Sequence, residues 1–250
     1  MSLRAVRRAV ALGFILIFCI LRYWKLRTHG PLSLERRAFW LHISANMALE
    51  RLGIRCHVEG TPPARGLLVS NHLGYLDIVI LSAATPCFFV SKREIAGWPF
   101  FGWAARSAGT IFLDRTSHAS AASVARQIAE RLQLPVPVLL FPEGTSTDGH
   151  HVLRFHTRLF EPAVAAGAPV TAAALRYETS NGVAEKDVCW FGDDAFLPHL
   201  WRTLCAPGFT ARVRFGEPRI YPDRQTAAIR THAEVAALRK VSSPAAPLIP

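Results

Sequence analysis

Residues 67–77 read LLVSNHLGYLD. The first three residues form an apolar run that is typical of a short buried strand. On one continuous helix, side chains five positions apart point in directions that differ by roughly 140°. A strand that ends near His72, a turn eased by Gly74 and a helix that starts near Leu76 would instead bring His72 and Asp77 together. We therefore predict a strand–turn–helix unit in which these two side chains form a pair.

This predicted pair has the chemistry of a general base and its orienting group. A carboxylate on Asp77 would accept a hydrogen bond from one imidazole nitrogen of His72 and so fix the tautomer. The other imidazole nitrogen would then be able to take a proton from a substrate. The alternative is a surface histidine near a helix-capping aspartate. The five-position spacing of His72 and Asp77 does not by itself distinguish the two interpretations.

Three further blocks follow in the chain, reading GTIFLDR over residues 109–115, FPEGTST over 141–147 and APVTAAAL over 168–175. In this order and spacing, the four blocks resemble those of the glycerolipid acyltransferase family, whose best-known members are the 1-acylglycerol-3-phosphate acyltransferases. The resemblance runs from about residue 67 to residue 175. It implies that His72 is the catalytic base and that Asp77 orients it.

The second block ends with Arg115, which the resemblance implies is a phosphate-binding residue. A guanidinium group can bind two phosphate oxygens at once, which suits an anionic acceptor. A surface ion pair of Arg115 with Asp114 or Glu143 is the alternative, because structural ion pairs have the same residue composition as such sites.

The third block supplies the other residues that the resemblance assigns to acceptor binding, namely Glu143, Gly144 and Thr145. Glycine permits close backbone approach or a positive φ angle, although a proline–glycine turn would explain the same residues. Many family members carry arginine after the Glu-Gly-Thr sequence, whereas this chain has Ser146. The expected acceptor site therefore has one positive charge fewer, which favours lysolipids with other head groups, such as lyso-ornithine lipid, as alternative acceptors.

Two other groups of residues could bind ions. Lys92 and Arg93 follow an expected strand and are possible anion-binding residues, with a solvated basic loop as the alternative. The histidines at positions 150, 151 and 156 cluster after the third block, but no paired cysteines or second carboxylate stand at ligand spacing. We therefore predict no metal site.

Strands and helices alternate along the chain. This alternation predicts an α/β fold with a mixed, largely parallel sheet flanked by helices. We expect strands over residues 54–59, 67–71, 87–90, 110–113, 136–141, 169–175 and 211–215, and helices over 34–52, 78–83, 121–132, 158–166, 197–204 and 223–241. Ligands of such sheets bind beyond the carboxyl ends of strands. Because His72, Arg115 and Glu143 all follow expected strands, we place them in one site.

The N-terminus carries an apolar run over residues 9–21 with basic residues on both sides, Arg4, Arg7 and Arg8 before it and Arg22, Lys25 and Arg27 after it. The run is shorter than the roughly 20 residues of a membrane-spanning helix, and positive charge on both flanks argues against crossing. We predict a helix that dips into or lies on the membrane. Together with the helix over 34–52 it would form a membrane-associated segment, and a buried core helix is the alternative.

The composition agrees with this organisation. The chain has 250 residues, a formal net charge of +11 and 50% hydrophobic residues, which favours an anionic membrane or substrate over nucleic acid as the binding partner. Its five cysteines are scattered and contain no Cys-x-x-Cys pair, which is typical of a reducing compartment. We expect membrane-associated helices over residues 1–52, the acyltransferase domain over 53–241 and a disordered tail over 242–250.

The resemblance implies a membrane acyltransferase at the cytoplasmic face of the cell membrane. Its donor would be acyl-CoA or acyl carrier protein as co-substrate, with no other cofactor, and its partners would be membrane lipids and a lysolipid. The acceptor expected first is 1-acylglycerol-3-phosphate, which gives phosphatidic acid, and lyso-ornithine lipid or another lysophospholipid is the alternative. A non-catalytic lipid-binding protein and a thioester or lipid hydrolase are the rival functions.

Overall fold

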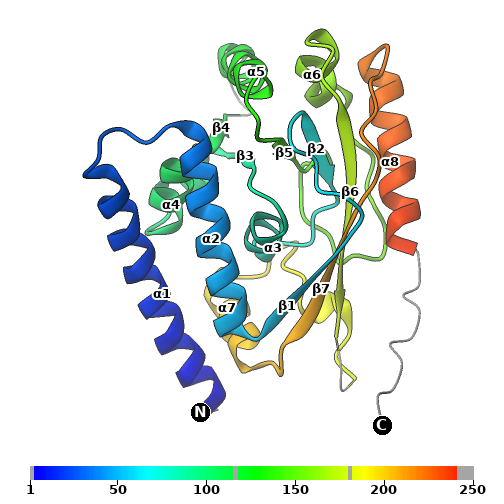
Figure 1. Ribbon diagram of the computed structural model, residues 1–250. Helices are drawn as coiled ribbons and strands as arrows, with labels where there is room; N and C mark the ends of the chain where they lie inside the picture. The colour runs from blue at the N-terminus through cyan, green and yellow to red at the C-terminus, as the bar shows by residue number, and fades with distance from the viewer. Residues whose placement is uncertain (1–2, 115–117, 180–181, 241–250) are drawn as a thin grey trace.

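The computed structural model describes residues 3–114, 118–179 and 182–240. In this part of the chain one mixed sheet of seven strands runs through the molecule in the order β1-β7-β6-β2-β5-β3-β4 (Figure 1). The strands β2 to β6 are parallel to one another, and β7 pairs antiparallel with β6 and parallel with β1. The predicted fold class is therefore confirmed. The strands are β1 (Ile54–Glu59), β2 (Leu67–Ser70), β3 (Phe88–Lys92), β4 (Ile111–Leu113), β5 (Val138–Leu140), β6 (Val170–Glu178) and β7 (Phe209–Phe215).

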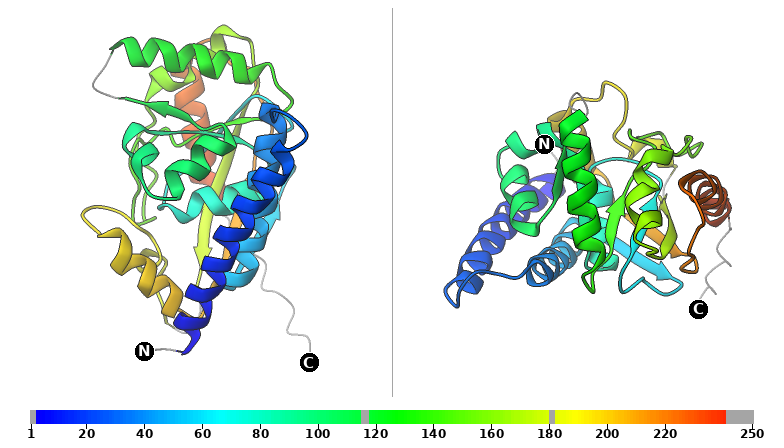
Figure 2. Two further views of the ribbon diagram at one scale, coloured as in Figure 1. Left: turned by 90° about the vertical axis from the view of Figure 1, so that its left-hand side faces the viewer. Right: turned by 90° about the horizontal axis from the view of Figure 1, so that it is seen from above.

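Helices cover both faces of the sheet (Figures 1 and 2). Their ends carry the expected signals: Ser33 caps the start of α2 by accepting a hydrogen bond from the Arg36 amide, and Asp223 caps α8 by accepting from two amides of its first turn. The helices are α1 (Leu3–Arg27), α2 (Leu34–Leu52), α3 (Leu76–Ala84), α4 (Phe101–Ala108), α5 (His118–Leu132), α6 (Glu161–Ala165), α7 (Phe196–Cys205) and α8 (Arg224–Lys240), with short 3-10 turns η1 (Arg93–Gly97), η2 (Thr157–Phe160) and η3 (Glu185–Asp187).

Strand β2 lies at the centre of the sheet and is buried on both faces. Leu68 packs into the core formed with α2 and α3, while Leu67 and Val69 pack into the core formed with α5, α6 and α8. All three side chains have no exposed surface. Burial of each contributes about 1.5–3 kcal/mol. This packing fixes the strand whose end carries His72.

Several element boundaries differ from the sequence prediction by a few residues, and two of the differences have identifiable reasons. Strand β6 continues beyond residue 175 to Glu178, because its second half pairs with β7 after its first half has paired with β2. The helix expected over 158–166 is divided into η2 and α6. Pro162 lies in the first turn of α6, where its missing N–H group costs no hydrogen bond.

The N-terminal helix is longer than the apolar run predicted. Helix α1 has 25 residues because the basic and aromatic flanks continue it, and by length and composition alone it could cross a membrane. Only 17% of its most apolar window is buried, which argues against the alternative of a core helix. The expectation that this segment is too short to span was therefore wrong.

Helix α1 rests on α2 and α4 through aromatic side chains. The ring of Tyr23 lies 5.2 Å from that of Trp40 and 5.5 Å from that of Trp103. Helix α2 also contributes Leu49 and Leu52 to the core of the sheet. The division at residue 52 therefore stays a prediction, and the tail over 242–250 lies outside the described residues.

Candidate active site

His72 and Asp77 meet as the strand–turn–helix prediction required. Strand β2 ends at Ser70 and α3 begins at Leu76, so the two side chains lie on either side of a tight turn. The Nδ1 atom of His72 is 2.7 Å from Oδ2 of Asp77. The His72 side chain is 22% exposed and the Asp77 side chain is fully buried. The imidazole therefore lies at the surface with a buried carboxylate behind it.

The carboxylate of Asp77 is surrounded by hydrogen-bond donors. Its Oδ2 also accepts from the amides of Leu73, at 2.6 Å, and Gly74, at 3.1 Å. Its Oδ1 accepts from the hydroxyl of Tyr177. Gly74 is required in this turn, because a Cβ atom there would lie 2.9 Å from the backbone nitrogen of Trp190. These donors compensate for the cost of burying the carboxylate.

The third sequence block encloses His72 from the side of β5. The amide of His72 donates to Oε1 of Glu143 at 2.8 Å, and its carbonyl accepts from the amide of Thr147 at 2.9 Å. The ring of Phe141 stacks on the imidazole with centroids 4.1 Å apart and planes inclined by 17°. The backbone and the ring of His72 are therefore both held by residues that lie about 70 positions later in the chain.

Glu143 connects the catalytic turn to the loop that follows it. It is 4% exposed, and its second oxygen accepts from the amide of Leu153 at 2.8 Å. Burial raises the pKa of Glu143, although its two hydrogen bonds from backbone amides act in the opposite direction. Both oxygens of this carboxylate thus hold the backbone. Direct contact of Glu143 with an acceptor stays a prediction, as does that of Gly144, which adopts φ +76°, and of the exposed Thr145.

The fourth block forms the first part of β6 and fixes the end of β2. The side chain of Asn71 donates to the carbonyl of Leu175 at 3.0 Å and accepts from its amide at 2.8 Å. This pair of bonds continues the parallel ladder one residue beyond β2. The strand end that precedes His72 is therefore locked to its neighbour.

Comparisons with known proteins agree with this geometry. A family model described as "Acyltransferase" matches residues 53–176, which contain all four blocks. The lyso-ornithine lipid O-acyltransferase of Pseudomonas aeruginosa is 35% identical over 190 residues, covering 75% of this chain and 71% of that protein. The chain belongs to the glycerolipid acyltransferase family. It is an enzyme, an O-acyltransferase, so the alternative of a non-catalytic lipid-binding protein was wrong.

Other relatives of this acyltransferase carry two different names. The lyso-ornithine lipid O-acyltransferase of Rhodobacter capsulatus is 38% identical, covering 74% of this chain and 70% of that one. The 1-acyl-sn-glycerol-3-phosphate acyltransferase of Neisseria gonorrhoeae is 35% identical, covering 74% and 72%. The crystal structure of the 1-acyl-sn-glycerophosphate acyltransferase PlsC of Thermotoga maritima has the same fold, with a TM-score of 0.67, 18% identity and 97% of each chain covered.

Of the three basic residues predicted to bind anions, the structure of the acyltransferase describes Lys92 and Arg93. Lys92 is the last residue of β3, at the same edge of the sheet as His72, with β5 between their strands. Arg93 is exposed and forms an ion pair with Asp114 at 3.2 Å. Arg115 lies outside the described residues, so its role stays a prediction. Among the residues that the structure describes, no group of His, Cys, Asp or Glu side chains is arranged to hold a metal ion.

Three residues of the site carry roles that the sequence did not assign. Phe141 and Thr147 lie inside the third block, but their contacts with His72 depend on how β5 and β2 pair. Tyr177 lies just beyond the fourth block. A tyrosine hydroxyl within an apolar strand needs a partner, and this was the signal that could have identified it.

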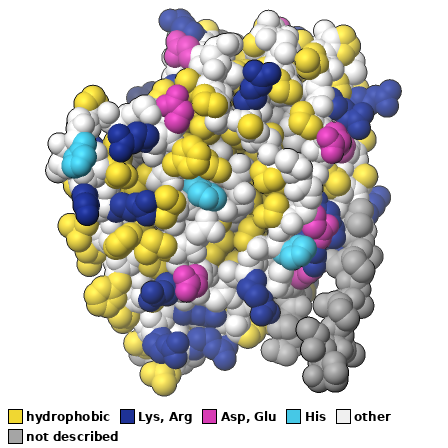
Figure 3. All heavy atoms as spheres, in the orientation of Figure 1, with side chains coloured by type: hydrophobic (Ala, Val, Ile, Leu, Met, Phe, Trp, Pro, Cys, Tyr) yellow, Lys and Arg dark blue, Asp and Glu magenta, His cyan; other side chains and the backbone are white. Residues whose placement is uncertain are grey.

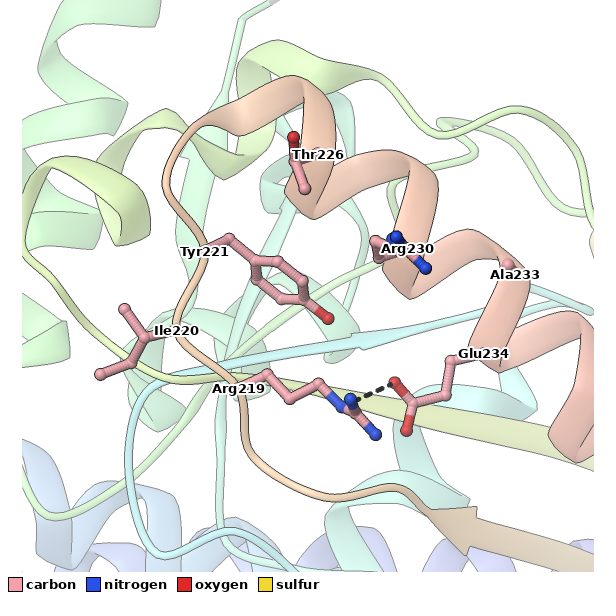
Figure 4. Close-up of a pocket in the computed structure, with 7 residues that line it drawn as sticks. All are labelled: Arg219, Ile220, Tyr221, Thr226, Arg230, Ala233 and Glu234. Carbon is pink, nitrogen blue, oxygen red and sulfur yellow. Dashed lines mark ion pairs between the residues drawn. The ribbon is translucent and has the colours of Figure 1, made fainter.

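A hollow of about 720 Å³ lies away from the catalytic turn, between α8 and the segment that leads into it (Figure 4). Arg219 and Glu234 face each other across it, with their charged atoms 3.8 Å apart. Arg219 pairs with Val170 at the start of β6, whereas His72 lies near the carboxyl ends of the parallel strands. No residue of the four blocks lines the hollow, so we do not assign it to the reaction.

Proposed function

We propose that this acyltransferase moves a fatty acyl group from the thioester of acyl-CoA or acyl carrier protein to the hydroxyl group of a lysolipid. One observation carries the proposal: Nδ1 of His72 is held by Asp77, while Nε2 forms no hydrogen bond within the described residues and the ring is partly exposed. A histidine held in this way can accept a proton from a bound hydroxyl group.

The reaction needs no covalent enzyme intermediate. Nε2 of His72 removes the proton of the acceptor hydroxyl as its oxygen attacks the thioester carbonyl carbon. The tetrahedral intermediate then collapses, the carbon–sulfur bond breaks, and the imidazolium returns the proton to the leaving thiolate. The products are an ester and a free thiol. Asp77 stabilises the imidazolium by its charge, and the stacked ring of Phe141 adds the attraction of an aromatic face for a cation.

For the acceptor we place lyso-ornithine lipid before 1-acylglycerol-3-phosphate, which the sequence had placed first. Thr147 bonds to the carbonyl of His72, so its neighbours Ser146 and Asp148 lie close to the catalytic turn. A serine and a carboxylate there suit a head group with an ammonium better than a phosphate monoester with two negative charges. The relatives from P. aeruginosa and R. capsulatus support this order, and the relative from N. gonorrhoeae supports the second candidate.

An acyl-transfer assay with both lysolipids tests the acceptor. We expect wild-type protein in membranes to acylate lyso-ornithine lipid faster than 1-acylglycerol-3-phosphate, with acyl-CoA and acyl carrier protein offered in parallel as donors. The Ser146→Arg variant should shift the ratio of the two kcat/KM values by about 10-fold toward the phosphate, because one added charge near a phosphate contributes about 1–2 kcal/mol.

The control is Ser123→Arg, which adds the same charge at an exposed position of α5. It should leave the ratio of the two kcat/KM values within about twofold. Helix α5 packs on the face of the sheet opposite to the one covered by α2 and α3, and α3 carries Asp77. Faster acylation of 1-acylglycerol-3-phosphate by wild-type protein would reverse the order of the two acceptors. Transfer to neither lysolipid would contradict the proposed function.

We also propose that α1 binds the protein to the cytoplasmic face of the membrane, where the thioester donors are available. Seven exposed apolar side chains recur along it at spacings of three or four residues, namely Leu3, Val6, Val10, Phe14, Ile17, Leu21 and Trp24. In the space-filling view, apolar and basic side chains gather along the edge where Figure 1 places α1 (Figure 3). An apolar stripe bordered by Lys and Arg suits an anionic bilayer surface.

Replacing two side chains of this stripe should release the protein from membranes. We expect Phe14→Ser combined with Ile17→Ser to lower binding to anionic vesicles by about 10-fold or more, because each side chain contributes about 1.5–3 kcal/mol on burial. Flotation of vesicles with bound protein measures the effect. The matched control is Ile220→Ser with Ile229→Ser, two exposed side chains outside α1. Equal binding of the two double variants would contradict a membrane role for the stripe.

A further inference from the structure

We infer that Tyr177 is a positioning residue of the reaction, whose hydroxyl group holds one oxygen of Asp77 and thereby sets how tightly the His72–Asp77 pair holds its proton. The inference rests on the proposed role of His72 as the general base. No described residue other than Tyr177 donates to Oδ1 of Asp77, whereas Oδ2 receives three donors.

The hydroxyl of Tyr177 can serve only as a donor here. Tyr177 is 2% exposed, and its ring packs on Phe209 with centroids 4.9 Å apart. Burial, together with the charge of Asp77 beside it, raises the pKa of the Tyr177 hydroxyl well above its usual value. The group therefore stays protonated across the working range and always presents its hydrogen to the carboxylate.

Tyr177 is itself fixed by the C-terminal helix. Its amide donates to Oε1 of Glu185 at 2.8 Å, and Oε2 of Glu185 accepts from Arg239 at 2.9 Å. Arg239, in the last turn of α8, also donates to the carbonyl of Leu175. Strand β7 holds Tyr177 from the neighbouring position in the sheet, because Tyr177 pairs with Ala211 in the antiparallel ladder of β6 and β7. These contacts fix the backbone of Tyr177, and the packing of its ring on Phe209 places the phenol beside Asp77.

This arrangement has a defined effect on the pair. A hydrogen bond donated to a carboxylate stabilises its charge and weakens its attraction for the proton of a neighbouring imidazolium. Without the Tyr177 hydroxyl, Asp77 would stabilise the imidazolium more strongly, and the base would be protonated up to a higher pH. Among the residues that the structure describes, Glu143 and the thiol of Cys189 are further titratable groups electrostatically coupled to Asp77, and they are left in place in the variants below.

The test is the pH profile of acyl transfer by Tyr177→Phe, which removes the hydroxyl and leaves the ring. We expect the acidic limb of kcat/KM to move upward by about 0.5–1 pH unit, because one hydrogen bond to a charged group is lost. At a fixed pH on that limb kcat/KM should fall by about 3- to 10-fold, which is the additional fraction of the base that such a shift protonates. The KM for the lysolipid should stay within about twofold, since Tyr177 is buried behind Asp77.

Tyr75→Phe is the matched control. It removes a partly buried hydroxyl, which bonds to His199 at 3.0 Å and does not reach Asp77. Both variants should lose a similar amount of thermal stability, but only Tyr177→Phe should move the acidic limb. An unmoved limb with kcat within about twofold of wild type would show that Tyr177 is merely structural and would overturn the inference.

Two further measurements test the inference independently of the activity of Tyr177→Phe. Site-specific 3-fluorotyrosine at position 177 keeps the hydroxyl in place and makes it a stronger donor, so the limb should move to lower pH. An upward or absent shift would contradict the inference.

If wild-type protein transfers no acyl group, the proposed function fails, and NMR titration of ¹⁵N-labelled His72 in detergent still reports the midpoint of its protonation. That midpoint should rise in Tyr177→Phe, and an unchanged midpoint would overturn the inference by itself.

Discussion

His72→Ala is expected to lower kcat for acyl transfer by about 10³-fold or more while the protein still folds and binds membranes. General base catalysis typically contributes about 10²–10⁴-fold. The fold should survive because Glu143 and Thr147 bond to the backbone of His72, which alanine retains. Transfer of a radiolabelled acyl group by membranes that contain the variant measures the loss, and circular dichroism with vesicle flotation measures folding and binding.

The control for His72→Ala is His151→Ala, an exposed histidine of the loop that follows the third block. It should retain the activity of wild type within about twofold. Retained turnover in His72→Ala would remove the proposed mechanism. Loss of folding in that variant would instead mean that the stacked contact of the imidazole with Phe141 is needed for stability.

Asp77→Asn is expected to lower kcat by about 10²–10³-fold, because the carboxamide carries no charge to stabilise the imidazolium. The structure determines how asparagine would be oriented. The amides of Leu73 and Gly74 both point at the Oδ2 position and require an acceptor there, so the carboxamide oxygen should occupy it. The NH₂ group would then face Tyr177, whose hydroxyl can accept as well as donate.

This orientation leaves an acceptor for Nδ1 of His72, so the tautomer is preserved and the loss is electrostatic. We expect the acidic limb of kcat/KM to move to lower pH in Asp77→Asn, opposite to the shift in Tyr177→Phe, because the imidazolium loses its partner charge. Asp193→Asn, at an exposed loop position, is the control. Turnover near that of wild type with an unmoved limb would contradict the role of Asp77.

The sequence predicted the catalytic turn correctly because the residues that specify this turn lie close together in the chain. The apolar run 67–69, Gly74 and the spacing of His72 and Asp77 specify a strand, a tight turn and a helix start within eleven residues. The structure confirms this unit and the α/β alternation of which it is part. The order of the motif blocks also identified the family. In the structure His72 lies just beyond β2 and Glu143 just beyond β5, and these neighbouring parallel strands bring the two residues together.

The sequence was less informative about how far elements extend and what each polar side chain contacts. The apolar run over 9–21 gave too short a helix, since packing of Tyr23 on Trp40 and Trp103 stabilises turns that hydropathy alone does not mark. Sequence reasoning did not predict that both oxygens of Glu143 accept hydrogen bonds from backbone amides, and its contact with an acceptor stays a prediction. Whether an acid faces a ligand or the backbone depends on contacts with distant residues.

By itself, then, the sequence determined the fold class, the His72–Asp77 pair and the family to which this acyltransferase belongs, because these depend on periodicity and short-range spacing. Only the tertiary structure decided what surrounds the pair. Phe141 and Thr147 reach His72 because β5 lies beside β2, and Tyr177 reaches Asp77 because β6 lies on the other side of β2. Strand order is set by the burial of the whole sheet between two layers of helices, which no single stretch of sequence encodes.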